Sequence, residues 1–207
     1  MDFFTNPNII FYLLAYLVGA IPFGLLLAKK FAGVDIQKSG SKSIGATNVL
    51  RVVKQNDPEL AKKLGIATIL LDALKGAVVI IIAKIYGMPM ETLWAIAILS
   101  VVGHCYSIYL NGEGGKGVAT GLGVFLVLIP IPTIIGAAIW GFCAKVLKIS
   151  SISSLLGLLG VIISAILLEN GLGVDSNSPM YIIGFIIFYK HIPNIVRVIK
   201  GEEKKVA

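Results

Sequence analysis

Charged side chains are scarce in this sequence: 14% of its 207 residues are Asp, Glu, Lys or Arg, whereas 57% are hydrophobic. A soluble domain carries roughly 25% charged residues, and a mean hydropathy of +0.90 lies far above what such a domain shows. The composition therefore excludes an ordinary soluble domain. Because hydrophobic runs long enough to cross a bilayer recur along the chain, we expect residues 1–207 to form a single integral membrane domain, with the lipid bilayer as its main partner.

Cysteine is rare as well. Cys105 and Cys143 each lie within an apolar run, which predicts two separate buried thiols and no disulfide. The sequence has no cluster of His, Cys and carboxylate residues with metal-ligand spacing, so we expect no metal and no cofactor. A secretory signal requires Lys or Arg before its hydrophobic run, and none precedes the first run here. We therefore expect that run to stay attached to the chain.

A net charge of +7 does not indicate nucleic acid binding in this chain. Its basic residues cluster beside hydrophobic segments, and no basic stripe interleaved with aromatic residues is present. The charge is expected to orient the helices instead. The sequence also gives no sign of an obligate protein partner.

Seven apolar runs are candidate transmembrane helices, so we predict an all-α membrane protein. They cover residues 9–28, 64–86, 92–110, 118–129, 131–146, 151–168 and 180–195. The fourth and fifth are short: the fourth, residues 118–129, reaches only about 18 Å at 1.5 Å per residue, whereas the hydrocarbon core is about 30 Å thick. Pro130 and Pro132 separate them, since a helix tends to end before proline. Two full crossings and a broken pair both remain open for 118–146.

The distribution of Lys and Arg predicts the orientation of these runs. If each run crosses once and the N-terminus lies outside, the cytoplasmic segments together hold 16 of the 18 basic residues. Those segments are 29–63, 111–117, 145–154 and 190–207. This asymmetry follows the positive-inside rule. A single crossing by 118–146 would export the basic C-terminal tail, so seven crossings or an equivalent re-entrant pair, with a cytoplasmic C-terminus, fit better.

The first cytoplasmic segment is rich in small and hydrogen-bonding residues. Residues 39–51 are Ser-Gly-Ser-Lys-Ser-Ile-Gly-Ala-Thr-Asn-Val-Leu-Arg. Glycines let backbone N–H groups approach an anion, Ser41 and Thr47 add hydroxyl donors, and Arg51 can bind a phosphate with two parallel hydrogen bonds. A flexible polar loop is the alternative, and the length of the segment favours a functional role only modestly.

A second polar segment precedes the fourth run. Residues 111–117 are Asn-Gly-Glu-Gly-Gly-Lys-Gly, and a glycine turn before a helix offers N–H groups and the positive end of the helix dipole to an anion. It is not a nucleotide-binding P-loop, because Leu110 and Gly117 stand where that pattern needs Gly and Ser or Thr. A turn that only joins two helices is the alternative. His104, which lies toward the end of the preceding run, could equally be a structural histidine.

Two more polar groups lie on the same predicted side. Residues 148–154 contain four serines at the start of the sixth run, where serines are ordinary N-caps. His191, Asn194 and Arg197 end the last run, where cations complement the helix dipole without any other role, although the dipole does not explain Asn194. Because all of these motifs share one predicted face, phosphate binding from the cytosol is the favoured interpretation.

Asp72 and Lys75 lie three residues apart within the second run and can pair on one helix face. A charge at mid-helix costs about 2.5–3.5 kcal/mol on insertion scales, so the pair should face the bundle interior or a polar cavity. It either locks helices together or contacts a ligand.

Taken together, the motifs resemble the membrane-bound acyl-phosphate glycerol-3-phosphate acyltransferases, the PlsY family of bacteria. The resemblance lies in the Gly-Ala-Thr-Asn core of 39–51, in Gly103-His104 followed by 114–120, and in the His-x-x-Asn-x-x-Arg pattern of 191–197. It implies a seven-helix bacterial inner-membrane enzyme with a cytoplasmic active site. Such an enzyme moves an acyl chain from acyl phosphate to the 1-hydroxyl of glycerol-3-phosphate, giving lysophosphatidic acid and phosphate.

The resemblance also assigns roles to individual residues. Those expected to be catalytic are Lys116, Arg51, Ser154, His191 and Asn194. Lys116 and Arg51 are expected to neutralise phosphate charge, and the other three to orient the acceptor. Those expected to bind substrate or phosphate are Ser41, Gly45, Thr47, Asn48, His104, Gly114, Gly115, Gly117 and Ser151. Asp72 and Lys75 are expected to support the site structurally.

The chemistry of the donor agrees with these residues. Acyl phosphate is a reactive mixed anhydride, so the enzyme mainly has to position two phosphates and stabilise developing charge. Soluble-headed acyltransferases pair a His with an Asp five residues later, but Tyr109 and Val196 stand at that distance from His104 and His191. The resemblance implies substrate-assisted catalysis, in which the donor's own phosphate accepts the hydroxyl proton.

Two other protein classes fit parts of the sequence. A secondary transporter for an anionic metabolite also has Gly and Pro breaks beside anion sites, but its site lies near the membrane midplane, and here the motifs lie at one face. A CDP-alcohol phosphotransferase needs several aspartates along two helices for its metal, and Asp72 is the only aspartate in any apolar run.

Overall fold

The computed structural model describes residues 6–168 and 171–205, and every regular element in them is helical. The elements are α1 (Pro7–Gly19), α2 (Phe23–Ala32), α3 (Ala46–Val53), α4 (Pro58–Ile85), α5 (Met90–Cys105), η2 (Ile108–Leu110), α6 (Val118–Leu128), α7 (Pro130–Leu147), α8 (Ser150–Leu168) and α9 (Ser178–Ile199). The all-α prediction is confirmed for this part of the chain. The first five residues, which precede the run predicted to stay attached, lie outside the described residues.

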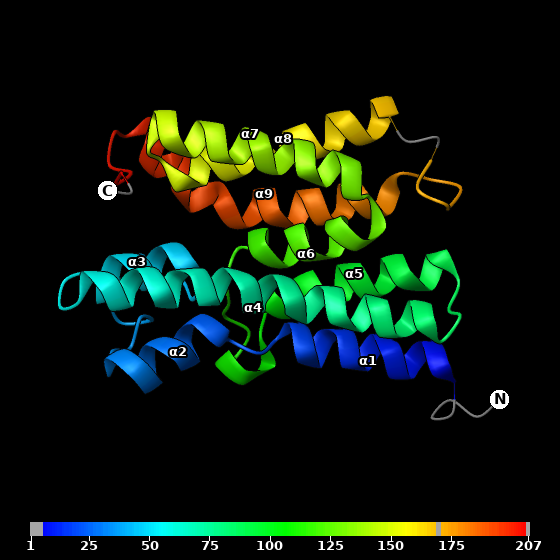
Figure 1. The fold of residues 1–207 in the computed structure, drawn as a ribbon, viewed down its shortest axis with the longest axis horizontal. Helices are drawn as coiled ribbons and strands as arrows, with labels where there is room; N and C mark the ends of the chain where they lie inside the picture. The colour runs from blue at the N-terminus through cyan, green and yellow to red at the C-terminus, as the bar shows by residue number, and fades with distance from the viewer. Residues whose placement is uncertain (1–5, 169–170, 206–207) are drawn as a thin grey trace.

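The long helices run side by side along one axis (Figure 1). α7 and α8 pack on each other at one edge, α9 and α6 lie in the middle, and α4, α5 and α1 form the other side. The start of α1 and the end of α9 lie at opposite ends of the bundle, and α3 packs beside α4 at the end where α9 finishes. The polar segments around α3 and α9 therefore share one end of the bundle.

Within the described residues, six helical segments are long and apolar enough to cross a membrane. They are Pro7–Ala32, Pro58–Ile85, Met90–Leu110, Pro130–Leu147, Ser150–Leu168 and Ser178–Ile199. The apolar helix Val118–Leu128 is shorter, as predicted. The prediction that the fifth run is also short is wrong, because α7 extends one residue further at each end and reaches 18 residues. Pro130 begins it, at a position where the missing N–H is not needed.

The first apolar run is also not the single helix that the sequence predicts. It is split into α1 and α2 at Pro22, which has no N–H to continue the helix and restricts the residue before it. The break frees the carbonyls of Ala20 and Ile21. Ser107 Oγ donates to the first at 2.6 Å and Lys75 Nζ to the second at 2.9 Å. These bonds satisfy backbone groups that lipid cannot satisfy.

Residues 39–51, predicted as a loop, are partly helical. Their second half forms most of α3, which is amphipathic and buries Val49, Val52 and Val53. These valines pack in a hydrophobic cluster with Leu25 and Leu64 from the flanking helices. Apolar burial of this kind gives a short helix most of its stability, and it places α3 firmly beside α4.

Gly123 allows α6 to touch α4, because a Cβ at this position would collide with the backbone of Ala73. We expect Gly123→Ala to force the helices apart and to destabilise the fold by about 1–3 kcal/mol, the usual cost of overpacking. The measurement is the thermal unfolding midpoint in detergent. Gly141→Ala on α7 is the matched control, because nothing lies within 4 Å of its added Cβ. Equal midpoints for the two variants would contradict this prediction.

Candidate active site

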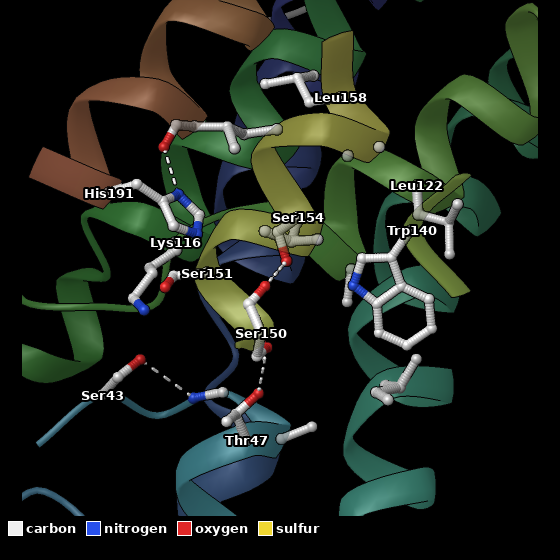
Figure 2. Close-up of a pocket in the computed structure, with 18 of the residues that line it drawn as sticks. Ser43, Thr47, Lys116, Leu122, Trp140, Ser150, Ser151, Ser154, Leu158 and His191 are labelled. Carbon is white, nitrogen blue, oxygen red and sulfur yellow. Dashed lines mark hydrogen bonds between the residues drawn. The ribbon is translucent and has the colours of Figure 1, made fainter. Parts of the chain in front are cut away.

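A cavity of about 220 Å³ lies where α3, the start of α6, the start of α8 and the end of α9 meet. Lys116, Ser151 and His191 lie on one side of it, and the apolar side chains of Leu122 and Trp140 lie on the other (Figure 2). The cavity is thus polar on the side of Lys116, Ser151 and His191 and apolar on the side of Leu122 and Trp140. This lining suits a ligand with an ionic head and a hydrocarbon part.

Most residues predicted to form the site line this cavity. They are Ser41, Gly45, Thr47, Asn48, Arg51, Asp72, His104, Lys116, Ser151, Ser154, His191 and Asn194. The predicted residues outside the lining are Lys75, Gly114, Gly115 and Gly117. Residues up to about 150 positions apart in the chain are therefore brought to one place.

Asn48 organises the first polar segment. Its buried amide Nδ2 donates to the carbonyls of Ile36 at 2.8 Å, Ser43 at 2.9 Å and Ser39 at 3.2 Å. Its Oδ1 accepts from the backbone N–H of Ser41 at 2.8 Å. The Asn48 amide therefore holds the loop in shape and places the Ser41 side chain at the cavity.

α3 connects this segment to α8. Thr47 Oγ1 lies 3.0 Å from Ser150 Oγ, within hydrogen-bond distance (Figure 2). Arg51 lies one turn further along α3 and also lines the cavity. The amphipathic helix thus buries its valines on one face and presents Thr47 and Arg51 from another.

The glycine turn packs against the end of α5. The N–H of Gly115 donates to the carbonyl of His104 at 2.9 Å. A Cβ on Gly114 would collide with the His104 carbonyl, and one on Gly115 with the His104 imidazole. Gly117 has φ +82°, a conformation that favours glycine, and it precedes α6 directly. These glycines lie outside the cavity lining, but their close packing sets the position of Lys116, whose side chain lines it.

Lys116 lies in a predominantly cationic environment. Burial lowers the pKa of its ammonium to about 8, with Glu203 opposing that shift and Arg197 and Arg51 adding to it. One carboxylate thus faces three cationic side chains around this part of the cavity. The excess of positive charge gives this side of the cavity a positive potential, which favours an anionic ligand.

Glu203 is a site residue that the sequence analysis missed. Its carboxylate accepts hydrogen bonds from Asn194 Nδ2 at 2.6 Å, Arg197 Nε at 2.7 Å and Ser151 Oγ at 2.9 Å. Burial alone would raise its pKa, but these hydrogen bonds outweigh burial and hold the pKa of Glu203 below its usual value. Glu203 thereby joins the start of α8 to the end of α9. In the sequence it belongs to a charged tail, Glu-Glu-Lys-Lys, with no local feature that marks it.

The serines of α8 do not act as the N-caps that the alternative interpretation suggests. Ser154 Oγ donates to the carbonyl of Ser150 at 2.8 Å, and Ser153 Oγ to the carbonyl of Ile149 at 2.9 Å, each one turn back along the chain. Ser151 is bound to Glu203. Ser154 lines the cavity with lone pairs free to accept from a ligand.

His191 also forms a hydrogen bond to the backbone one turn earlier in its helix. Its Nδ1 lies 2.7 Å from the carbonyl of Ile187 (Figure 2). A carbonyl only accepts, so Nδ1 carries the proton, and in a neutral ring Nε2 is left as an acceptor. His191 therefore offers the cavity a hydrogen-bond acceptor that suits a hydroxyl group.

Asp72 and Lys75 pair as predicted, with Lys75 Nζ 2.8 Å from Asp72 Oδ1 and both side chains buried. Asp72 reaches the cavity lining, whereas Lys75 lies outside the lining and contacts the Ile21 carbonyl and His104. The pair thus ties α4 to α5 and to the break between α1 and α2.

Comparison with known proteins covers nearly the whole chain. Residues 9–201 match the family model described as glycerol-3-phosphate acyltransferase. Two proteins named glycerol-3-phosphate acyltransferase match over the full length of both chains: one from Aliarcobacter butzleri is 73% identical and one from a Nitratiruptor species is 61% identical.

Solved structures agree with this assignment. The glycerol 3-phosphate form of PlsY, an integral membrane glycerol 3-phosphate acyltransferase, has a TM-score of 0.83 at 31% identity and covers 97% of this chain and 96% of its own. The lysophosphatidic acid form has a TM-score of 0.79 at 32% identity, over 96% and 94%. The family match, the two close relatives and the shared membrane fold confirm the resemblance, and the chain belongs to the glycerol-3-phosphate acyltransferase family of integral membrane enzymes.

Proposed function

We propose that this acyltransferase moves an acyl chain from acyl phosphate to the 1-hydroxyl of sn-glycerol-3-phosphate, giving lysophosphatidic acid and phosphate in bacterial phospholipid synthesis. The observation that carries the proposal is the two-sided lining of the cavity, with cations and hydroxyls on one side and apolar side chains on the other. A phosphorylated alcohol matches the first side and an acyl chain the second. The related PlsY structures in glycerol 3-phosphate and lysophosphatidic acid forms support this substrate and product.

The reaction needs little from the protein beyond positioning and charge. The acceptor hydroxyl oxygen attacks the acyl carbon, a C–O bond forms, the bond from that carbon to the phosphate oxygen breaks, and the departing phosphate takes the hydroxyl proton. Lys116 and Arg51 neutralise phosphate charge. His191 Nε2 accepts a hydrogen bond from a hydroxyl group of glycerol-3-phosphate, and Asn194 and Ser154 orient this substrate. No cofactor takes part in this scheme.

The proposed location is the bacterial inner membrane, with seven crossings, the N-terminus outside and the cavity facing the cytoplasm. The basic segments at the α3 end of the bundle support this orientation. Lys38→Cys and Asp175→Cys, each in a chain free of other cysteines, test it in intact cells. An impermeant maleimide should label residue 175 and leave residue 38 unlabelled, and the reverse pattern would overturn the orientation.

The decisive experiment for the reaction is an assay of purified protein in detergent. Acyl phosphate, acyl-CoA and acyl-carrier protein are each supplied with glycerol-3-phosphate, and the lipid product is identified. We expect lysophosphatidic acid from acyl phosphate. Product from acyl-CoA alone would overturn the donor. Uptake of labelled glycerol-3-phosphate into sealed liposomes without acyl product would favour a transporter.

The activity should depend on pH through Lys116. With a pKa of about 8, its ammonium is present below that pH and lost above it, so we expect kcat/KM for the anionic substrates to fall as the pH rises through about 8. Lys116→Arg should remove this fall, because an arginine stays protonated. The measurement is a pH profile of initial rates, with hydrolysis of the donor measured separately. A basic limb that Lys116→Arg leaves unchanged would contradict the prediction.

A further inference from the structure

A buried polar cluster joins α4 and α5 behind the cavity. Lys75 Nζ lies 2.8 Å from Asp72 Oδ1, 2.9 Å from His104 Nδ1 and 2.9 Å from the carbonyl oxygen of Ile21. The side chains of Asp72, Lys75 and His104 are each at most 3% exposed. The cluster is therefore almost entirely buried, and its hydrogen bonds can be assigned by counting donors and acceptors.

This count sets the tautomer of His104. A lysine ammonium has three N–H donors and no acceptor, and its three neighbours are the Asp72 carboxylate, the Ile21 carbonyl and His104 Nδ1. The first two can only accept, so the third N–H points to Nδ1, which must be unprotonated. His104 Nδ1 lies 3.7 Å from Asp72 Oδ1, too far for a hydrogen bond of its own. A neutral His104 then carries its proton on Nε2.

The Nε2 edge of His104 faces the glycine turn. Lys75 lies outside the cavity lining and His104 within it, so the imidazole spans from the helix interior to the cavity. A Cβ on Gly115 would collide with Nε2, which places this nitrogen against the backbone just before Lys116. Within residues 6–168 and 171–205, Nε2 has no hydrogen-bond partner. Among the described residues, the fully buried side-chain polar atoms without a partner are Ser100 Oγ and Thr120 Oγ1, so His104 Nε2 is open to the cavity that His104 lines. An N–H donor that is open to the cavity beside the glycine turn is the complement of a phosphate oxygen.

We infer that His104 donates its Nε2–H to the substrate phosphate held beside the glycine turn, and that Lys75, neutralised by Asp72, is the positioning residue that selects this tautomer. The inference rests on the proposed function. It gives the two histidines opposite tasks: His191 has its proton on Nδ1 and offers an acceptor, whereas His104 has its proton on Nε2 and offers a donor. The two tautomers thereby help to distinguish a hydroxyl group from a phosphate group, in addition to the positive charge of Lys116 and Arg51.

The chain suits a spectroscopic test, because His104 and His191 are its only histidines. Nitrogen NMR of protein labelled with 15N-histidine, with His191→Gln for assignment, should show His104 protonated at Nε2. Inorganic phosphate or glycerol-3-phosphate, added to saturation, should shift the Nε2 resonance. An Nδ1-protonated His104, or an Nε2 resonance that neither anion moves, would overturn the inference.

Variants of Lys75 test its positioning role. Lys75→Met alone would leave the Asp72 charge buried and unpaired, which can prevent folding, so Asp72→Asn is combined with it. This double variant should mix the two His104 tautomers and lower kcat/KM by about 10- to 100-fold, a loss like that seen when the groups that orient metal-bound histidines are removed. Lys84→Met, at the exposed far end of α4, is the control and should match wild type. A folded double variant that keeps the wild-type tautomer would overturn the role of Lys75.

Replacements of His104 test the donor itself. A glutamine amide reaches about as far as Nε2, whereas an asparagine amide reaches only as far as Nδ1. His104→Gln should therefore keep at least about 10 times the kcat/KM of His104→Asn, the effect expected for one hydrogen-bond donor. Equal activities would overturn the donor role.

The two proposals fail in distinguishable ways. Acyl transfer by a wild-type protein whose His104 is protonated at Nδ1 would overturn this inference and leave the proposed function intact. A wild-type protein that shows the Nε2–H tautomer and binds inorganic phosphate there, yet transfers no acyl group, would overturn the proposed function instead.

Discussion

Lys116→Ala is expected to lower kcat for acyl transfer by a factor of about 10²–10³, the usual cost of removing one group that stabilises charge in the transition state. The Lys116 side chain is half-buried at the polar side of the cavity, where its charge is less screened than in bulk water. Arg51→Ala should have a similar effect, because the guanidinium lines the same cavity from α3. Initial rates of lysophosphatidic acid formation by purified protein measure both.

Lys145→Ala is the control for this prediction. Lys145 lies in the last turn of α7 at the same end of the bundle, is exposed and does not line the cavity. Its loss should leave the rate close to wild type. Near-normal acyl transfer by Lys116→Ala and Arg51→Ala, with the same unfolding midpoint as wild type, would remove both residues from the mechanism.

Gly114→Ala should be nearly as damaging, although Gly114 lies outside the cavity lining. A Cβ at this position would collide with the carbonyl of His104 and the backbone of Cys105, and neither can move away as a flexible side chain could. The turn must shift, and it carries Lys116 with it. Since a misplacement of about 1 Å can cost 10²-fold in rate, we expect kcat to fall by about that factor.

A second glycine of the same turn distinguishes two causes of lost activity, a collision of the added Cβ and a loss of loop flexibility. Gly112 has φ +84° with nothing within 4 Å of an added Cβ, and asparagine tolerates this backbone conformation better than most residues. Gly112→Asn should therefore keep most of the activity. If Gly112→Asn and Gly114→Ala lose activity equally, close packing of the turn is not what positions Lys116.

The helices themselves were largely predictable. Hydrophobic runs and proline positions are local features, so the run at 151–168 corresponds closely to α8, and the run at 92–110 covers most of α5 together with η2. Pro130 was correctly placed at the boundary between α6 and α7. Pro22 also lacks the N–H that a helix needs, but the residues on both sides of it are apolar. Hydropathy alone therefore gives no sign of the break between α1 and α2.

The site was predicted as a set of residues and not as an arrangement. The first polar segment, Lys116, His191 and Asn194 do meet at one cavity, whereas the glycines beside Lys116 lie outside its lining. Glu203 was missed because its neighbours in sequence are solvated charges, and its bonds to Ser151 and Asn194 exist only after α8 and α9 have packed. The serines of α8 matched a local capping pattern, but their hydroxyls bond to carbonyls one turn back and to Glu203.

By itself the sequence determined the membrane environment, the positions of most helices and the motifs that would serve a phosphorylated substrate. These follow from hydropathy, proline and glycine, whose effects are local. Only the tertiary structure decided which groups face one another: Lys75 meets the Ile21 carbonyl across 54 positions, and Ser151 meets Glu203 across 52. Such contacts depend on how each helix is rotated and how closely its glycines let it approach a neighbour, and hydropathy carries no record of either.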